Sequence, residues 1–146
     1  MRLIRLAILT LLSLTMTMTM TMPAAVAASL IVAIDLSDQE MTVRSAGRQL
    51  YDWPVSTART GYRTPTGVFR PYRLERMWYS TIYDYAPMPW SVFFRGGYAI
   101  HGTTDIAHLG RPASHGCVRL HPDNAKILYG LIRKVGMSET RIVIRP

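Results

Sequence analysis

The chain has 146 residues, of which 49% are hydrophobic and 18% are charged, and its formal net charge is +8 at pH 7. This length fits one domain that can bury a single core. The basic residues are scattered and no recognised nucleic-acid-binding motif accompanies them, so nucleic acid is excluded as the expected partner.

The N-terminus predicts a secretory signal peptide over residues 1–28. A basic start precedes an apolar core at 6–14, and Ala25-Val26-Ala27 fits the small-x-small rule for cleavage. The apolar core is shorter than the roughly 20 residues that span a bilayer, so we expect no stable membrane insertion after cleavage. Residues 29–146 are then expected in the periplasm or cell envelope. Their net charge, +6 without the two signal arginines, favours an anionic envelope polymer as partner.

The first half of the exported chain predicts β-strands. An apolar run at Ser29–Asp35 is followed by a polar turn and by the alternating segment 40–44, and an extended pattern resumes over 48–55. Turn residues separate these runs, so we expect a β-meander. A further short strand is expected at 68–70.

The span from Pro71 to Trp90 is predicted to be irregular, because three prolines interrupt it. Long loops in small domains are usually functional or disordered, and the many aromatic residues favour an ordered flap rather than a disordered linker. Two roles stay open for this flap, as part of the core or as a lid over a bound substrate. Its aromatic residues are Tyr72, Trp78, Tyr79, Tyr83, Tyr85 and Trp90.

The C-terminal part predicts one amphipathic helix and a last strand. Pro122 suits the first helical turn, Gly136 is a natural stop, and the segment 140–144 reads as a strand. The expected fold is mainly β with this one helix. The apolar residues at helical spacing are Ile127, Leu128, Leu131, Ile132 and Val135.

Cys117 is the only cysteine, and it lies in the run Ser114-His115-Gly116-Cys117-Val118-Arg119-Leu120. In an oxidising compartment an unpaired cysteine is either an intermolecular crosslinker or a reactive thiol. A buried structural cysteine is disfavoured, because Gly116 offers nothing to pack and the charged neighbours are costly to bury unpaired. We therefore predict a nucleophile.

Two histidines are candidates for the base that activates this thiol. Extended runs at 91–94 and 98–101, separated by a glycine turn, place His101 at a strand end. His115 is adjacent to the motif, but near neighbours in sequence rarely face one another, so His101 is favoured. Gly116 gives the backbone freedom to aim its own N–H and that of Cys117 at the oxyanion of an attacked carbonyl.

The remaining polar residues allow other readings. A Cys/His metal site is disfavoured because no metal-ligand spacing is present, so we expect no metal. His108 and His121 are interpreted as loop and helix-entry residues. For Arg119, a structural salt bridge and a bidentate grip on a substrate carboxylate are equally open.

Three segments together resemble the L,D-transpeptidase (YkuD-type) catalytic domain of bacterial cell walls: Ala99–Thr103, Leu109–Leu120 and Thr64–Phe69. The resemblance covers nearly all of residues 29–146. It implies a β-rich, sandwich- or barrel-like domain that needs no cofactor, and many members of that family are acylated at the cysteine by carbapenems.

The resemblance also implies an activity. Family members attack the bond between the third residue of a peptidoglycan stem and the D-alanine at position four, release D-alanine and form a thioester. An amine of a second stem then gives a 3→3 crosslink, while other members transfer to an outer-membrane lipoprotein, exchange D-amino acids or admit water. By this resemblance Cys117 is the nucleophile, His101 is the general acid/base, and the Gly102 carbonyl orients His101. The residues expected to shape the oxyanion and substrate pocket are Ser114, His115, Gly116 and Arg119.

Two other functions stay open from the sequence. An L,D-carboxypeptidase or endopeptidase would hydrolyse the same thioester, and a non-catalytic wall-binding module would lack the chemistry. The intact His101 and Cys117 disfavour that module. Because residues 29–146 leave no room for a separate peptidoglycan-binding module, we expect targeting to rest on the catalytic domain and its charge.

Overall fold

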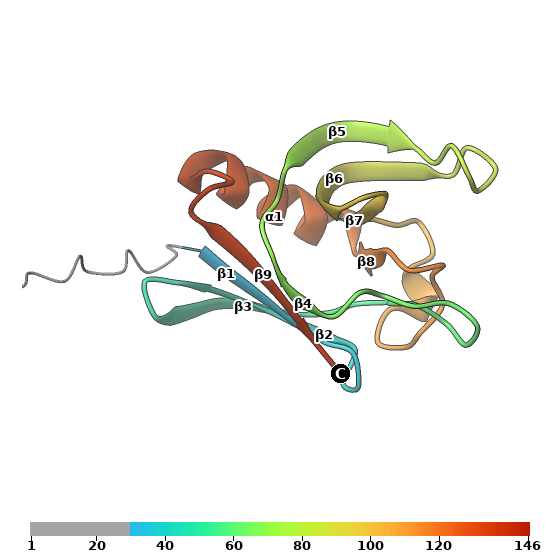
Figure 1. The fold of residues 1–146 in the computed structure, drawn as a ribbon, viewed down its shortest axis with the longest axis horizontal. Helices are drawn as coiled ribbons and strands as arrows, with labels where there is room; N and C mark the ends of the chain where they lie inside the picture. Colours follow the sequence, from blue (N-terminus) through green and yellow to red (C-terminus); the bar gives the residue numbers. More distant parts are fainter. Residues whose placement is uncertain (1–29) are drawn as a thin grey trace, which may run out of the picture.

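Two β-sheets and one long helix make up residues 30–146, the part of the chain that this computed structural model describes (Figure 1). The predicted signal peptide lies outside these residues. One sheet has the strand order β3-β2-β1-β9-β4 and the other the order β5-β6-β7-β8. The elements are β1 (Leu30–Asp35), β2 (Glu40–Ser45), β3 (Arg48–Pro54), β4 (Gly67–Phe69), β5 (Arg73–Tyr79), β6 (Pro87–Arg95), β7 (Tyr98–Gly102), η1 (Ile106–His108), β8 (Val118–Leu120), α1 (Pro122–Val135) and β9 (Thr140–Arg145).

The first sheet confirms the predicted meander and its closing strand. β1, β2 and β3 pair antiparallel in succession, and β9 returns to lie parallel to β1. Alternate residues of β1 point to opposite faces, so Leu30, Val32 and Ile34 are fully buried, whereas Ile31 between them is exposed. These side chains face a core shared with the second sheet and the helix. The mainly β prediction is therefore confirmed.

Helix α1 packs against β6 and β7 through one face. That face carries Ala125, Leu128, Tyr129 and Ile132, which are three or four residues apart and buried. Ile127, which the sequence pattern placed on this face, is instead exposed. The predicted bounds are confirmed, with the helix starting at Pro122 and Gly136 following its last residue. Among residues 30–146 no helix is long and apolar enough to cross a membrane.

The prediction of an irregular segment from Pro71 to Trp90 is wrong. β5 and β6 form an antiparallel hairpin there, and only residues 80–86 make a loop between them. Pro87 and Pro89 lie two residues apart in the part of β6 that pairs with β5 alone, so their nitrogens, which cannot donate a hydrogen bond, share one edge of the strand. That edge can stay unpaired there, because pairing with β7 begins only at Val92. The aromatic side chains divide, with Trp78 and Trp90 packed against buried clusters and Tyr79 and Tyr85 exposed.

Candidate active site

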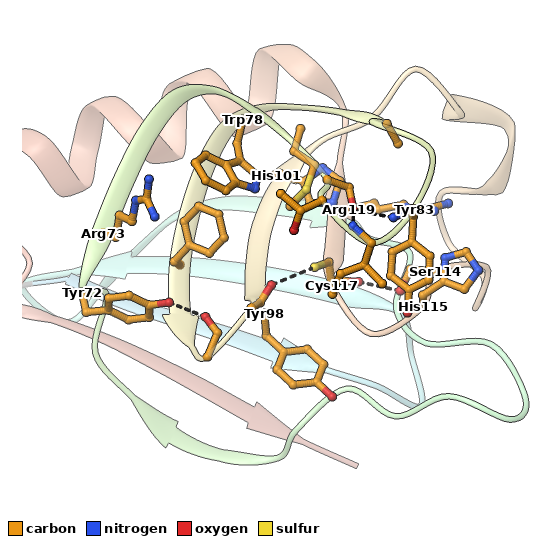
Figure 2. A pocket seen from close by; sticks show the side chains of 18 residues that line it. Tyr72, Arg73, Trp78, Tyr83, Tyr98, His101, Ser114, His115, Cys117 and Arg119 are labelled. Atoms are coloured by element: carbon orange, nitrogen blue, oxygen red, sulfur yellow. Dashed lines mark hydrogen bonds between the residues drawn. The ribbon is translucent and has the colours of Figure 1, made fainter.

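The parallel pairing of β7 and β8 brings the predicted thiol and base together. His101 of β7 is in register with Arg119 of β8, and Cys117 directly precedes β8. Because side chains two residues apart share a face, Cys117 and Arg119 lie on the same face of the sheet as His101. All three side chains line one cleft of about 430 Å³, seen in Figure 2.

His101 is held in one tautomer. Its ring is buried, and Nδ1 lies 2.7 Å from the Gly102 carbonyl oxygen. A carbonyl only accepts hydrogen bonds, so Nδ1 carries the proton and Nε2 keeps its lone pair. Burial lowers the pKa of His101 to about 4, with a smaller lowering from the charge of Arg119 and an opposing contribution from the Gly102 hydrogen bond. The imidazole is therefore neutral near pH 7 and able to accept a proton at Nε2.

Cys117 is a protonated thiol at rest. Its side chain is partly buried, and Sγ lies 3.8 Å from the Gly97 carbonyl oxygen. Burial raises the pKa of the Cys117 thiol above its ordinary value, although a backbone hydrogen bond from Ala99 and the charge of Arg119 act to lower it. A neutral thiol beside a neutral imidazole needs a base at the moment of attack, which is the work that His101 Nε2 can do.

Ser114 fixes the shape of the loop that carries the thiol. Its buried hydroxyl accepts a hydrogen bond from the Gly116 N–H at 3.0 Å and donates one to the Cys117 carbonyl at 2.6 Å. The sequence suggested that the Gly116 N–H would meet an oxyanion, but Ser114 already occupies that donor. Of the two donors expected, the Cys117 N–H is the one that remains for this purpose.

Thr64 is a supporting residue to which the sequence gave no role, although it opens one of the family-like segments. It is 3% exposed, and its hydroxyl donates to the Gly116 carbonyl at 2.9 Å while accepting from the Ala58 N–H at 3.1 Å. Residues 56–58 also pair with the loop, through bridges from Ser56 to Arg119 and from Ala58 to Ser114. The cysteine loop is thus held from outside as well as from within.

The two glycines of the site are needed for close approach rather than for contact with a substrate. Gly116 has a φ of +134°, and a Cβ atom there would lie 2.6 Å from a Tyr98 ring carbon. A Cβ atom on Gly102 would lie 3.0 Å from the Pro122 Cα and 3.1 Å from the Pro89 Cγ. Gly102 therefore lets α1 and β6 approach the strand that carries His101.

His115 connects the cysteine motif to the 80–86 loop between β5 and β6. Its ring stacks on Tyr83 at a centroid distance of 4.1 Å and an interplanar angle of 10°, and it meets Tyr62 edge-on at 4.7 Å. Tyr83 belongs to the 80–86 loop, and Figure 2 shows it beside His115 at one end of the cleft. Partial burial, followed by the charges of Arg59 and Arg119, lowers the pKa of His115. A neutral imidazole stacks on tyrosine, so this contact closes the loop over the cleft.

Replacing Tyr83 with alanine removes this stacked ring. We expect KM for the substrate to rise up to about tenfold, because an aromatic pair is worth about 0.5–1.5 kcal/mol, while kcat changes less. Steady-state kinetics on purified protein measure both constants. Tyr85→Ala is the matched control, because Tyr85 lies in the same loop and is 76% exposed. Equal effects of the two substitutions would refute a specific role for the Tyr83–His115 contact.

Arg119 forms the salt bridge that was one of the two roles left open by the sequence, and its grip on a substrate carboxylate stays a prediction. Its guanidinium lies 3.5 Å from a carboxylate oxygen of Asp105, and it also lines the cleft. The other oxygen of Asp105 contacts His108 Nδ1 at 2.5 Å. Chiefly the hydrogen bond from His108 lowers the pKa of Asp105, so the carboxylate is charged at neutral pH and holds Arg119 in place.

Asp105 is therefore expected to act as a positioning residue. Asp105→Asn should raise KM for the substrate up to about fivefold and leave kcat nearly unchanged, because partly exposed ion pairs contribute at most about 1 kcal/mol. The comparison is Asp123→Asn, which removes a carboxylate next to His121 outside the cleft. A fall in kcat without a change in KM would contradict this assignment.

The other histidines occupy the places expected of them. His108 ends η1, and His121 is the N-cap of α1, accepting a hydrogen bond from the Asp123 N–H at 3.3 Å. Within residues 30–146 no three side chains of His, Cys, Asp or Glu are grouped as metal ligands. The expectation that no metal or cofactor is needed stays a prediction.

The fold and this geometry define a class of site, in which a buried imidazole on β7 and a thiol at the start of the parallel strand β8 line one cleft beside the 80–86 loop. Residues 29–144 match the family model of the L,D-transpeptidase catalytic domain, YkuD. The chain belongs to this family, as its motifs indicated.

Individual relatives agree with the family model. The chain is 27% identical to the YkuD protein of Bacillus subtilis strain 168 over 90 residues, which are 62% of this chain and 52% of the relative. Its structure is similar to an L,D-transpeptidase from Mycobacterium smegmatis, with a TM-score of 0.74, 24% identity, and coverage of 82% of this chain and 59% of the other. For an L,D-transpeptidase from Stackebrandtia nassauensis the TM-score is 0.71, the identity is 27%, and the coverage is 81% and 56%. The chain thus spans between half and two thirds of the length of these proteins.

Proposed function

We propose that this protein is a peptidoglycan L,D-transpeptidase that uses Cys117 as its nucleophile. The observation that carries the proposal is the His101–Gly102 hydrogen bond, which leaves Nε2 free on the sheet face that also carries the thiol. Membership of the family supports the substrate class, a peptidoglycan stem peptide. The presence of both Cys117 and His101 favours an enzyme over a non-catalytic wall-binding module.

The first half-reaction forms an acyl-enzyme. Sγ of Cys117 attacks the carbonyl carbon between the third residue of the donor stem and D-alanine, while His101 Nε2 takes the thiol proton. The Cys117 N–H is assigned to the developing oxyanion. The carbon–nitrogen bond then breaks, and His101 returns the proton to the departing amine. D-alanine is released, and the donor stem stays bound to Cys117 as a thioester.

The second half-reaction transfers the acyl group. The neutral side-chain amine of a diamino acid on an acceptor stem attacks the thioester carbonyl, and His101 accepts a proton from that amine. The carbon–sulfur bond breaks, the proton passes to the thiolate, and a new amide bond crosslinks the two stems. An amine of an outer-membrane protein would follow the same route, whereas water would give the carboxypeptidase or endopeptidase reaction.

Product analysis separates these outcomes. Residues 29–146 are incubated with tetrapeptide muropeptides, and the products are identified by mass. Crosslinked dimers with released D-alanine support acyl transfer. Tripeptide as the only product would show that the enzyme hydrolyses the thioester instead. Cys117→Ala should abolish D-alanine release, and retained turnover in that variant would refute the mechanism.

We also propose that the protein acts in the periplasm or cell envelope. The support is the sequence of the N-terminus, with its basic start, apolar core and small-x-small site. Fractionation of cells that express the full chain tests this, with N-terminal sequencing of the mature product. Recovery of uncleaved protein from the cytoplasm would overturn it.

A further inference from the structure

A second cleft, of about 290 Å³, lies next to the first and is lined by two arginines. Its lining consists of Arg63, Pro65, Thr66, Arg95 and Tyr98, none of which is acidic. The ion pairs formed among residues 30–146 include neither Arg63 nor Arg95. Two guanidinium groups without a carboxylate partner make this cleft a site for an anion.

This cleft shares a wall with the cleft that holds the thiol. Tyr98 lines both of them, and the carbonyl of the adjacent Gly97 is the group that Cys117 Sγ contacts. Gly116 is wedged between the Tyr98 ring and the Arg63 carbonyl oxygen, each within 3.0 Å of where a Cβ atom would lie. A molecule in the second cleft is therefore separated from the cysteine loop by one side chain.

The arginines are placed by their neighbours. Arg63 precedes Thr64, whose hydroxyl is bonded to both Gly116 and Ala58, so its backbone is fixed against the cysteine loop. The Arg95 guanidinium lies 6.0 Å from the centre of the Phe69 ring, within reach of a cation–π interaction. Both arginines are exposed, so their guanidinium groups can turn toward a carboxylate and grip it through two parallel hydrogen bonds.

The size of the cleft limits what it holds. A cleft of about 290 Å³ lies at the lower limit of ligand pockets, which span about 300–1,000 Å³, so it suits a small group such as one end of a peptide better than a length of polymer. An acceptor stem peptide has such an end, because its free carboxylates are not consumed when its side-chain amine reacts. A carboxylate of the donor stem can be bound by a different cation, because Arg119 lines the cleft that contains the thiol.

We propose that Arg63 and Arg95 bind a free carboxylate of the acceptor stem peptide and direct its amine toward the thioester on Cys117. This inference rests on the proposed transpeptidase function and names the site of its second substrate. The donor and acceptor then occupy adjoining clefts on the two sides of Tyr98. Recognition of the acceptor becomes separable from formation of the acyl-enzyme.

The kinetic test separates the two half-reactions. The double variant Arg63→Gln/Arg95→Gln should release D-alanine from a donor tetrapeptide within about twofold of the wild-type rate, while KM for an acceptor stem rises at least about tenfold. Arg70→Gln is the matched control, because Arg70 is exposed and lines neither cleft. An acceptor whose free carboxylates are converted to amides should react as poorly with the wild type as the acid does with the double variant. Unchanged KM in the double variant, or equal use of acid and amide, overturns the proposal.

A binding measurement tests whether the second cleft binds the acceptor, independently of catalysis. A tripeptide acceptor is titrated by calorimetry into Cys117→Ala protein with and without the two arginine substitutions, after circular dichroism has shown that both are folded. Binding that weakens at least about tenfold on loss of the arginines supports the site. Binding of inorganic polyphosphate but not of the tripeptide would assign the cleft to an envelope polymer and overturn the proposal. If the wild type releases no D-alanine, the proposed function fails while this measurement still decides what the cleft binds.

Discussion

His101→Gln is expected to lower the rate of D-alanine release by about 10³-fold, within the range that general acid–base catalysis contributes. Glutamine can still donate to the Gly102 carbonyl, but it offers no basic nitrogen in place of Nε2. Single-turnover release of D-alanine from a donor tetrapeptide measures the acylation step alone. His115→Gln, which removes the other candidate base, should cost much less. A larger loss from His115→Gln would reverse the assignment.

The same residue sets the acidic limit of activity. Because burial lowers the pKa of His101 to about 4, the base stays unprotonated well below the ordinary histidine range. We expect kcat/KM for the donor to hold from neutral pH down to about pH 5 and to fall only as the pH approaches 4. A pH–rate profile that falls near pH 6.5 would contradict this expectation.

Stability should follow pH through the same shift. Between about pH 6.5 and 4 the unfolded chain binds a proton at His101 that the folded protein does not, so the free energy of unfolding decreases as the pH falls through this window. The loss is at most about 3 kcal/mol, from a shift of about 2.5 pKa units. Urea denaturation at several pH values measures it, and His101→Gln should flatten the dependence. An unchanged slope in that variant would show that other groups cause it.

Gly116→Ala is expected to damage both folding and catalysis. A φ of +134° is unfavourable for alanine, and its Cβ atom would lie 2.6 Å from the Tyr98 ring and 3.0 Å from the Arg63 carbonyl oxygen. The backbone must therefore shift, which disturbs the bonds that Ser114 and Thr64 make to this loop. We expect a loss of about 2–4 kcal/mol in the free energy of unfolding and at least about 100-fold in D-alanine release.

The chain supplies a matched control for this substitution. Gly47, in the turn between β2 and β3, has a φ of +76°, but nothing lies within 4 Å of a Cβ atom there. Gly47→Ala therefore tests backbone strain without the clash and far from the thiol. It should cost about 1 kcal/mol and leave D-alanine release unchanged. If Gly116→Ala behaves no worse than Gly47→Ala, the close packing around the cysteine loop does not matter.

Local patterns in the sequence predicted the strands and the helix where one physical signal dominated. Alternation marked β2, the apolar run marked β1, and Pro122 and Gly136 bounded α1. The β5–β6 hairpin was missed because Pro87 and Pro89 suggest irregular chain, and their tolerance depends on β7 ending short of them. Such pairing is a tertiary property that no local pattern carries.

The site was partly predictable for a similar reason. The motif identified Cys117 and the strand end identified His101, because both signals are local. The bond from Thr64 to the Gly116 carbonyl joins residues 52 positions apart, and the capture of the Gly116 N–H by Ser114 depends on how the loop turns. The stacking of Tyr83 on His115 likewise depends on how the 80–86 loop folds back toward the cysteine motif. Of these contacts, the Ser114 hydrogen bond leaves the Cys117 N–H as the donor for the oxyanion.

The central claim is that Cys117 becomes acylated by a stem peptide, and intact-protein mass tests it most directly. Residues 29–146 are mixed with a tetrapeptide donor in the absence of an acceptor amine, quenched in acid and weighed, with free D-alanine measured in the same sample. The account predicts a covalent adduct of the donor minus D-alanine, mapped to Cys117 and absent from Cys117→Ala. No adduct and no D-alanine, or an adduct that persists in Cys117→Ala, would contradict it.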